Sequence, residues 1–181
     1  AEYVLCAMLE MKIGLHEMDK RFRTEGWGGR QPGTSIYHKE IRSRTVGIIG
    51  YGHIGKEIAK RAAAFDMRII AIRRSQQDAV APLDWIGTAD QLDKLLSESD
   101  FVVVACDMNE ETIGMIDAPQ IGKMKPSGII INVARGRIIA EEPLYNALKN
   151  KKIGGAVLDV WYNYIGNDQE EVSPSNLPFE Q

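Results

Sequence analysis

The sequence predicts an α/β fold, a doubly wound parallel sheet with helices on both faces, preceded by a long N-terminal helix. Two observations support this class. Short, almost wholly apolar runs alternate with amphipathic segments, as expected for strands buried on both faces of a sheet and for the helices that cover them. A glycine triplet also joins the first apolar run to the first amphipathic segment. The expected strands are TVGII, RIIAI, FVVVAC, GIIINV and GGAVLDV.

Along the chain we expect a leading helix, a core and a tail. Apolar residues recur at helical spacing through residues 1–25, which predicts one long helix with a wide apolar face. These residues are Val4, Leu5, Met8, Leu9, Met11, Leu15, Met18 and Phe22. The turn formers in GWGGRQPGTS predict a loop after this helix, and residues 45–160 hold the alternating strands and helices. Residues 161–181 show no period and contain prolines, which predicts an extended surface segment.

Composition favours a single soluble, cytoplasmic domain. The 181 residues are 44% hydrophobic, and the net charge of −3 with scattered basic residues argues against a nucleic-acid partner. Cys6 and Cys106 lie far apart without CxxC spacing, so we expect neither a disulfide framework nor a metal site. No apolar run approaches the length of a membrane span. The chain lacks an initiator Met and stops at LPFEQ, and it is therefore expected to be a fragment.

The glycine triplet lies in TVGIIGYGHIG, as Gly50, Gly52 and Gly55. In a strand–turn–helix unit, the first glycine permits a tight turn and the second lets the backbone approach a pyrophosphate. The third lets the helix pack close to the strand. Glycine-rich turns are common, but a second predicted strand here closes a βαβ unit, which predicts a dinucleotide-binding domain of Rossmann type over residues 1–181. The variable loop positions, also expected near the cofactor, are His53 and Ile54; a solvent-facing His53 fits equally well.

The end of the second strand distinguishes NADP from NAD. An acidic side chain at this position accepts hydrogen bonds from the adenosine ribose, whereas a cation suits a 2′-phosphate. The sequence RIIAIRRS places Arg73 and Arg74 there, followed by Ser75, and it has no acidic residue before Asp78. The alternative is that the two arginines only begin a solvated loop. We predict NADP in preference to NAD.

Three blocks of this sequence resemble the D-2-hydroxyacid dehydrogenase family. They are VGIIGYGHIGKEIAKRAAAFDMRIIAI, DQLDKLLSESDFVVVACDMNEETIGMI and MKPSGIIINVARGRIIAEEPLYNALKNKKIGGAVLDV. The most specific part is NVARGRIIAEEPLYNAL, because a fold of this class does not demand an Arg-Gly pair followed by an acidic helix start. The resemblance covers essentially the whole chain.

This resemblance implies an architecture larger than the chain. In the family, a cofactor domain is inserted into a substrate domain built from both chain ends, so the substrate domain would be absent here. The first helix of the cofactor domain helps to form a homodimer in such enzymes, which implies the same for the helix over residues 1–23. Packing of that helix on its own sheet is the alternative.

The resemblance also implies roles for individual residues. Arg135 matches the catalytic arginine that binds the substrate carboxylate beside the nicotinamide, which suits the two-pronged guanidinium. Asp159 matches the carboxylate that holds the nicotinamide amide. Further cofactor contacts are implied at Thr112 and at the backbone of Cys106, Val133 and Ala134. Asp107 directly follows Cys106, in a loop that the resemblance places near the nicotinamide and where family members often carry proline.

The sequence departs from the family at the expected acid–base pair. The usual glutamate position, five residues after Asp159, holds Tyr164. None of His16, His38 and His53 matches the catalytic histidine, which is expected in a segment after LPFEQ. For the full-length protein we expect reversible hydride transfer between a nicotinamide cofactor and a small 2-hydroxy or 2-keto acid, whereas the fragment alone should be inactive. The alternative is a dehydrogenase-like protein that senses dinucleotide or binds partners without turnover.

Overall fold

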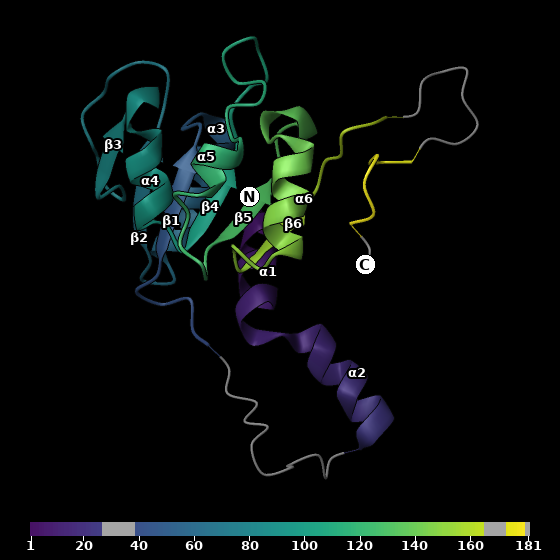
Figure 1. Cartoon of the computed structure of the whole chain (residues 1–181). Helices are drawn as coiled ribbons and strands as arrows, with labels where there is room; N and C mark the ends of the chain where they lie inside the picture. The colour runs from purple at the N-terminus through teal and green to yellow at the C-terminus, as the bar shows by residue number, and fades with distance from the viewer. Residues whose placement is uncertain (27–38, 165–172, 180–181) are drawn as a thin grey trace.

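The computed structural model describes residues 1–26, 39–164 and 173–179, and its centre is a six-stranded sheet in the order β3-β2-β1-β4-β5-β6 (Figure 1). Every neighbouring pair of strands is parallel. The strands are β1 (Thr45–Ile49), β2 (Arg68–Ile72), β3 (Trp85–Gly87), β4 (Phe101–Val104), β5 (Ile129–Asn132) and β6 (Gly155–Leu158). The predicted α/β class and parallel sheet are confirmed. The expectation of five strands was wrong, because the three residues of β3 are too few to form an apolar run.

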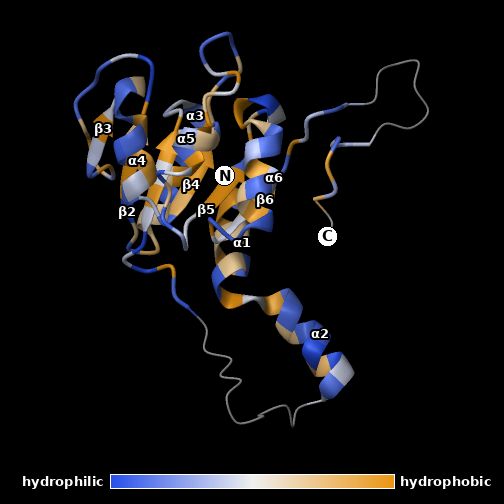
Figure 2. Cartoon of the chain, in the orientation of Figure 1, coloured by the Kyte–Doolittle hydropathy of each residue, from blue (hydrophilic) through white to orange (hydrophobic). Residues whose placement is uncertain are grey.

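Helices cover both faces of the sheet, as predicted. One face packs against α1 (Glu2–Ile13) and α3 (His53–Ala63), and the other against α4 (Leu92–Glu98), α5 (Ala118–Ile121) and α6 (Glu141–Lys149). The side chains of neighbouring residues in one strand point to opposite faces of the sheet. Ile48 joins the cluster that contains Val4 and Ile58, whereas Ile49 joins the cluster that contains Leu95 and Leu144. Figure 2 shows the strands as the most apolar part of the chain.

The prediction of one long N-terminal helix is confirmed only in part: the segment is helical, but Gly14 divides it into α1 and α2 (Leu15–Glu25). Gly14 has a φ of 70°, and its N–H donates to the carbonyl of Glu10 at 2.7 Å. A glycine in this left-handed conformation ends a helix even where the apolar period continues through it. Helix α1 buries residues such as Val4 and Met8, whereas α2 has no buried residue and runs away from the sheet (Figure 1).

The chain reverses its direction of strand addition at one point in the sheet. From β1 it proceeds through α3 to β2 and then to β3, and it returns to place β4 on the opposite side of β1. The carboxyl ends of β1 and β4 therefore lead to connections that diverge. In open parallel sheets, ligands bind in the crevice outside the strands at such a switch point.

The tail has no helix or strand at residues 161–164 or 173–179, but it is anchored to the domain. Glu141, the first residue of α6, accepts hydrogen bonds from the hydroxyl of Ser175 at 2.6 Å and from the N–H of Asn176 at 2.9 Å. The ring of Phe179 lies 5.6 Å from that of Tyr145. Part of the predicted surface segment is thus held against α6, and residues 165–172 and 180–181 lie outside the described residues.

Candidate functional site

The glycine triplet lies between β1 and α3, at the switch point of the sheet. Gly50 has a φ of 101°, and a Cβ atom there would lie 2.6 Å from the backbone of Cys106, which follows β4. A Cβ atom on Gly55 would lie 2.3 Å from the carbonyl oxygen of Gly50. Both positions therefore require glycine for the protein's own packing. Around Gly52, in contrast, a Cβ atom would meet no atom of the described residues within 4 Å, which leaves open space where the second glycine is expected to face a pyrophosphate.

The N-terminus of α3 faces the same open space. Gly52 is the N-cap residue and provides no side-chain hydrogen bond, so no side chain of the cap satisfies the first N–H groups of the helix. His53 is exposed and Ile54 is half exposed in this first turn. Free N–H groups and the positive end of the helix dipole suit an anionic phosphate, and the residues of this loop therefore fit a dinucleotide.

Beyond β2, the two predicted arginines differ in their surroundings. Arg73 is half-buried, its N–H donates to the carbonyl of Gly87 at 2.9 Å, and its guanidinium hydrogen-bonds the side-chain oxygen of Gln77. Arg74 and Ser75 are exposed. These three residues lie at the carboxyl edge of the sheet, one strand away from the glycine loop, so they can contact a ligand that extends from Gly52 across β2.

The connection after β4 holds three predicted residues in a compact turn. The hydroxyl of Thr112 donates to the carbonyl of Asp107 at 2.8 Å and accepts the N–H of Asn109 at 2.8 Å, while Asp107 itself is exposed. Burial raises the pKa of the Cys106 thiol to about 11, and the nearby carboxylate of Asp107 adds to the rise. Cys106 is therefore a neutral thiol at pH 7, and its environment provides no activation as a nucleophile.

After β5 the chain forms the turn that carries Arg135, which is exposed. Asn132, the last residue of β5, is fully buried, and its side chain binds this turn: Oδ1 accepts the N–H of Ala134 at 3.0 Å, and Nδ2 donates to the carbonyl of Arg135 at 2.9 Å. The N–H of Val133 donates to the carbonyl of Val104 at 3.2 Å, so the half-buried Val133 and Ala134 lie beside the end of β4.

Asp159 follows β6, and its N–H donates to the carbonyl of Asn132 at 3.0 Å. Its side chain is exposed. Burial raises the pKa of Tyr3 in α1, and the negative charge of Asp159 adds to the rise. The start of α1 therefore lies within electrostatic range of the predicted nicotinamide residue.

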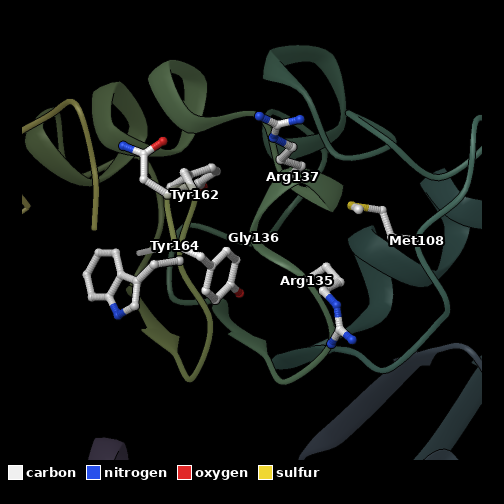
Figure 3. A pocket seen from close by; sticks show the side chains of 8 residues that line it. Met108, Arg135, Gly136, Arg137, Tyr162 and Tyr164 are labelled. Carbon is white, nitrogen blue, oxygen red and sulfur yellow. The ribbon is translucent and has the colours of Figure 1, made fainter. Parts of the chain in front are cut away.

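A hollow of about 440 Å³ lies beside Arg135 (Figure 3). Its other lining residues are Met108, Gly136, Arg137, Trp161, Tyr162, Asn163 and Tyr164. Tyr164, at the position where the family usually has glutamate, is 62% exposed in this hollow. Tyr162 is 8% exposed, and its hydroxyl has no hydrogen-bond partner among the described residues. The pKa of Tyr162 is raised above its ordinary value by burial, with a further contribution from Glu141.

The structure thus gathers the predicted residues along one edge of the sheet, in two groups. The glycine loop and residues 73–75 lie at the ends of β1 and β2, whereas Arg135 and Asp159 lie at the ends of β5 and β6. Since neighbouring strands are about 4.8 Å apart, Arg73 and Arg135 are separated by roughly 15 Å, and only an extended ligand could contact both groups. Sequence reasoning missed Asn132, Met108 and Trp161. Only Asn132 carried a signal, as an amide that ends the apolar run GIII.

The described residues contain no group of three or more His, Cys, Asp or Glu side chains that could hold a metal ion. Among the helices at residues 1–26, 39–164 and 173–179, none is long and apolar enough to cross a bilayer. His38 lies outside the described residues.

Comparison with known proteins identifies the family. Residues 5–177 match the D-isomer specific 2-hydroxyacid dehydrogenase, NAD binding domain, and the chain belongs to this family. It is 41% identical to a glyoxylate reductase of Thermococcus gammatolerans over 98% of this chain and 54% of the relative. The chain spans about half the length of the curated relatives it matches. The resemblance inferred from the sequence is confirmed.

Solved structures agree with the fold and include both forms of the cofactor. An acyclic imino acid reductase in complex with NADPH and D-arginine superposes with a TM-score of 0.77 at 29% identity, over 90% of this chain and 50% of that chain. The NAD-dependent formate dehydrogenase of Staphylococcus aureus, in complex with NAD, gives a TM-score of 0.74 at 29% identity, over 89% and 47% of the two chains. With the family match, this chain is a nicotinamide-dinucleotide domain.

Proposed function

We propose that the full-length protein is an oxidoreductase that transfers a hydride between a nicotinamide cofactor and C2 of a small 2-keto or 2-hydroxy acid. The observation that carries the proposal is the placement of the glycine loop and Arg135 at one edge of one sheet, on either side of its switch point. A bound nicotinamide would supply the hydride chemistry. The protein would supply orientation and charge.

The resemblance to the family and the positions of the residues together support a role for each of them. Gly50, Gly52, Gly55 and the first turn of α3 would bind the pyrophosphate through backbone N–H groups. The exposed guanidinium of Arg135 would bind the substrate carboxylate with two hydrogen bonds and orient the keto oxygen. Asp159 would accept a hydrogen bond from the nicotinamide amide, and Thr112 with the backbone of Cys106, Val133 and Ala134 would line the cofactor. The group that donates the proton is expected outside this chain, in the substrate domain.

Turnover tests this proposal against the alternative of a dinucleotide sensor. Full-length protein should consume NADPH when glyoxylate, hydroxypyruvate or another 2-keto acid is added, as followed by absorbance at the nicotinamide band. The position of Tyr164 in the hollow, where the family usually has glutamate, supports the sensor. Cofactor binding without turnover over a broad panel of keto acids would favour the sensor and count against the enzyme.

We further propose that the domain prefers NADP to NAD, because Arg73 and Arg74 follow β2 and no acid takes the ribose-binding position. Arg73→Ala should weaken NADPH binding by about 10- to 100-fold and leave NADH binding nearly unchanged, since hydrogen bonds to charged groups contribute about 1.5–3 kcal/mol. Fluorescence titration of the full-length protein with both reduced cofactors measures this. Lys60→Ala, which removes an exposed cation from α3, is the control. Tighter binding of NADH, unchanged in Arg73→Ala, contradicts the proposal.

We also propose that α2 packs against a second copy of the chain in a homodimer. No residue of α2 is buried, and Leu15 is 61% exposed on the same face as Met18. Leu15→Lys should convert the full-length dimer into a monomer in sedimentation velocity, because it places a charge in an apolar contact. His16→Lys adds the same charge on another face of α2 and should stay dimeric. A dimer that persists in Leu15→Lys excludes this contact.

A further inference from the structure

Asn132 is an unusual residue for the centre of this sheet. It ends β5, whose other three residues are buried isoleucines, and its side chain is fully buried. A buried amide costs free energy unless its donors and acceptor are paired. Both polar atoms of this side chain are paired, and each of them bonds to the backbone of the turn that follows.

These two hydrogen bonds connect Asn132 to the guanidinium of Arg135 through the backbone. Oδ1 of Asn132 accepts a hydrogen bond from the N–H of Ala134. The carbonyl of Ala134 in turn accepts a hydrogen bond at 2.7 Å from Nη1 of Arg135. Nδ2 of Asn132 donates a hydrogen bond to the carbonyl of Arg135, which also accepts one from the N–H of Ile138 at 3.2 Å. Apart from its bond to Ala134, the side chain of Arg135 has no partner among residues 1–26, 39–164 and 173–179, so the backbone of the turn sets the position from which the guanidinium extends.

The opposite side of the same turn is fixed by close packing. A Cβ atom on Gly136 would lie 2.2 Å from the carbonyl oxygen of Trp161, so the turn lies directly against the segment that lines the hollow (Figure 3). The backbone carbonyl of Asn132 also accepts the N–H of Asp159 at 3.0 Å. Asn132 therefore forms hydrogen bonds to the backbone of both Arg135 and Asp159, through its side-chain amide and its main-chain carbonyl respectively.

We propose that Asn132 is a positioning residue, whose amide sets the turn 133–136 so that Arg135 presents its guanidinium to the substrate carboxylate. The kinetic part of this inference rests on the proposed function. Asn132 would contact neither substrate nor cofactor through its side chain, which is fully buried. Its effect would pass through Ala134 and Arg135, and a displacement of about 1 Å at such a group can lower a rate about 100-fold.

The test uses the full-length protein with Asn132→Leu, which removes both hydrogen bonds and keeps the number and branching of the side-chain heavy atoms. Asn132→Ser, which replaces the amide by a single shorter hydroxyl, serves if the leucine variant does not fold. Ser99→Ala is the matched control: Ser99 is also fully buried, but its hydroxyl binds the carbonyl of Leu95 at 2.6 Å, before β4 and at the opposite edge of the sheet. Three quantities are measured: amide hydrogen exchange of peptides that cover residues 133–139, kcat and KM for glyoxylate, and Kd for NADPH.

The expected result is faster exchange in residues 133–139 by about tenfold or more in Asn132→Leu and no change there in Ser99→Ala. We expect kcat to fall about 100-fold. The Kd for NADPH should change much less, because the substitution leaves the glycine loop intact. In an Arg135→Ala background, Asn132→Leu should lower kcat no further, because the two residues act as one unit. Unchanged exchange in residues 133–139, or an undiminished kcat, overturns the proposal. If the wild-type protein turns over no keto acid, the proposed function fails, and hydrogen exchange alone then decides whether Asn132 holds the turn.

Discussion

Arg135→Ala is expected to lower kcat/KM of the full-length protein for a 2-keto acid by about 1,000-fold, which corresponds to about 4 kcal/mol of transition-state stabilisation. The guanidinium offers a planar pair of donors to a carboxylate, and alanine leaves that carboxylate without a charged partner beside the nicotinamide. The side chain of Arg135 is exposed, and among the described residues it bonds only to the carbonyl of Ala134, so its removal should leave stability within about 0.5 kcal/mol. Steady-state kinetics and urea unfolding measure the two quantities.

Two further variants separate a specific contact from a general effect of charge. Arg137 lines the same hollow, and its guanidinium points away from that of Arg135 (Figure 3). Arg137→Ala removes the same charge and should reduce kcat/KM by less than about threefold, since long-range effects of exposed charges are screened by salt. Arg135→Lys keeps the charge but lacks the planar pair of donors, and its loss of kcat/KM should lie between those of Arg135→Ala and Arg137→Ala. Equal losses in Arg135→Ala and Arg137→Ala would show that the hollow acts only through its overall charge.

The strands and their order of appearance could be predicted because each central strand is buried on both faces and is therefore a continuous apolar run. β1 and β4 are examples, with every residue buried. β3 escaped prediction because it has three residues and lies at the edge of the sheet, where neither length nor periodicity marks it. The break in the N-terminal helix escaped prediction for a different reason. Apolar periodicity measures which face a residue occupies, and it is insensitive to the single left-handed residue Gly14 that ends α1.

In the candidate site, too, some features could be predicted from the sequence and others could not. The glycine loop, Arg73 and Arg135 could be located because parallel strands bring their carboxyl ends to one edge, so sequence order determines which ends meet. Contacts between distant segments could not be inferred: Glu141 binds Ser175, and Gly136 lies against Trp161, through packing that no local pattern encodes. The amide of Asn132 stands out at the end of an apolar run, but its role could not be inferred from the sequence for a related reason. Its side chain bonds to backbone groups, which every sequence contains.

The glycine loop allows stability and ligand binding to be separated by two substitutions three residues apart. Gly52→Ala should lower the affinity for NADPH by about tenfold or more, because the added methyl group occupies the space through which a pyrophosphate approaches. Its stability should change by less than about 1 kcal/mol. Loss of glycine entropy in the unfolded chain favours the variant, whereas alanine is a poorer N-cap, and no atom in the part of the chain that the structure describes lies within 4 Å of the new Cβ.

Gly55→Ala should give the opposite balance, with a loss of about 1–3 kcal/mol in the free energy of unfolding. The new Cβ would lie 2.3 Å from the carbonyl oxygen of Gly50, so α3 must move away from β1, and this overpacking exceeds the gain of about 1 kcal/mol in helix propensity. Dinucleotide titration and thermal unfolding of both variants in the full-length protein provide the measurement. If Gly52→Ala binds NADPH as tightly as the wild type, the pyrophosphate does not approach this loop, and the open space at Gly52 has another origin. If instead Gly52→Ala unfolds as readily as Gly55→Ala, its weaker binding would reflect lost structure. The separation of the two effects is therefore what assigns Gly52 to the ligand and Gly55 to the fold.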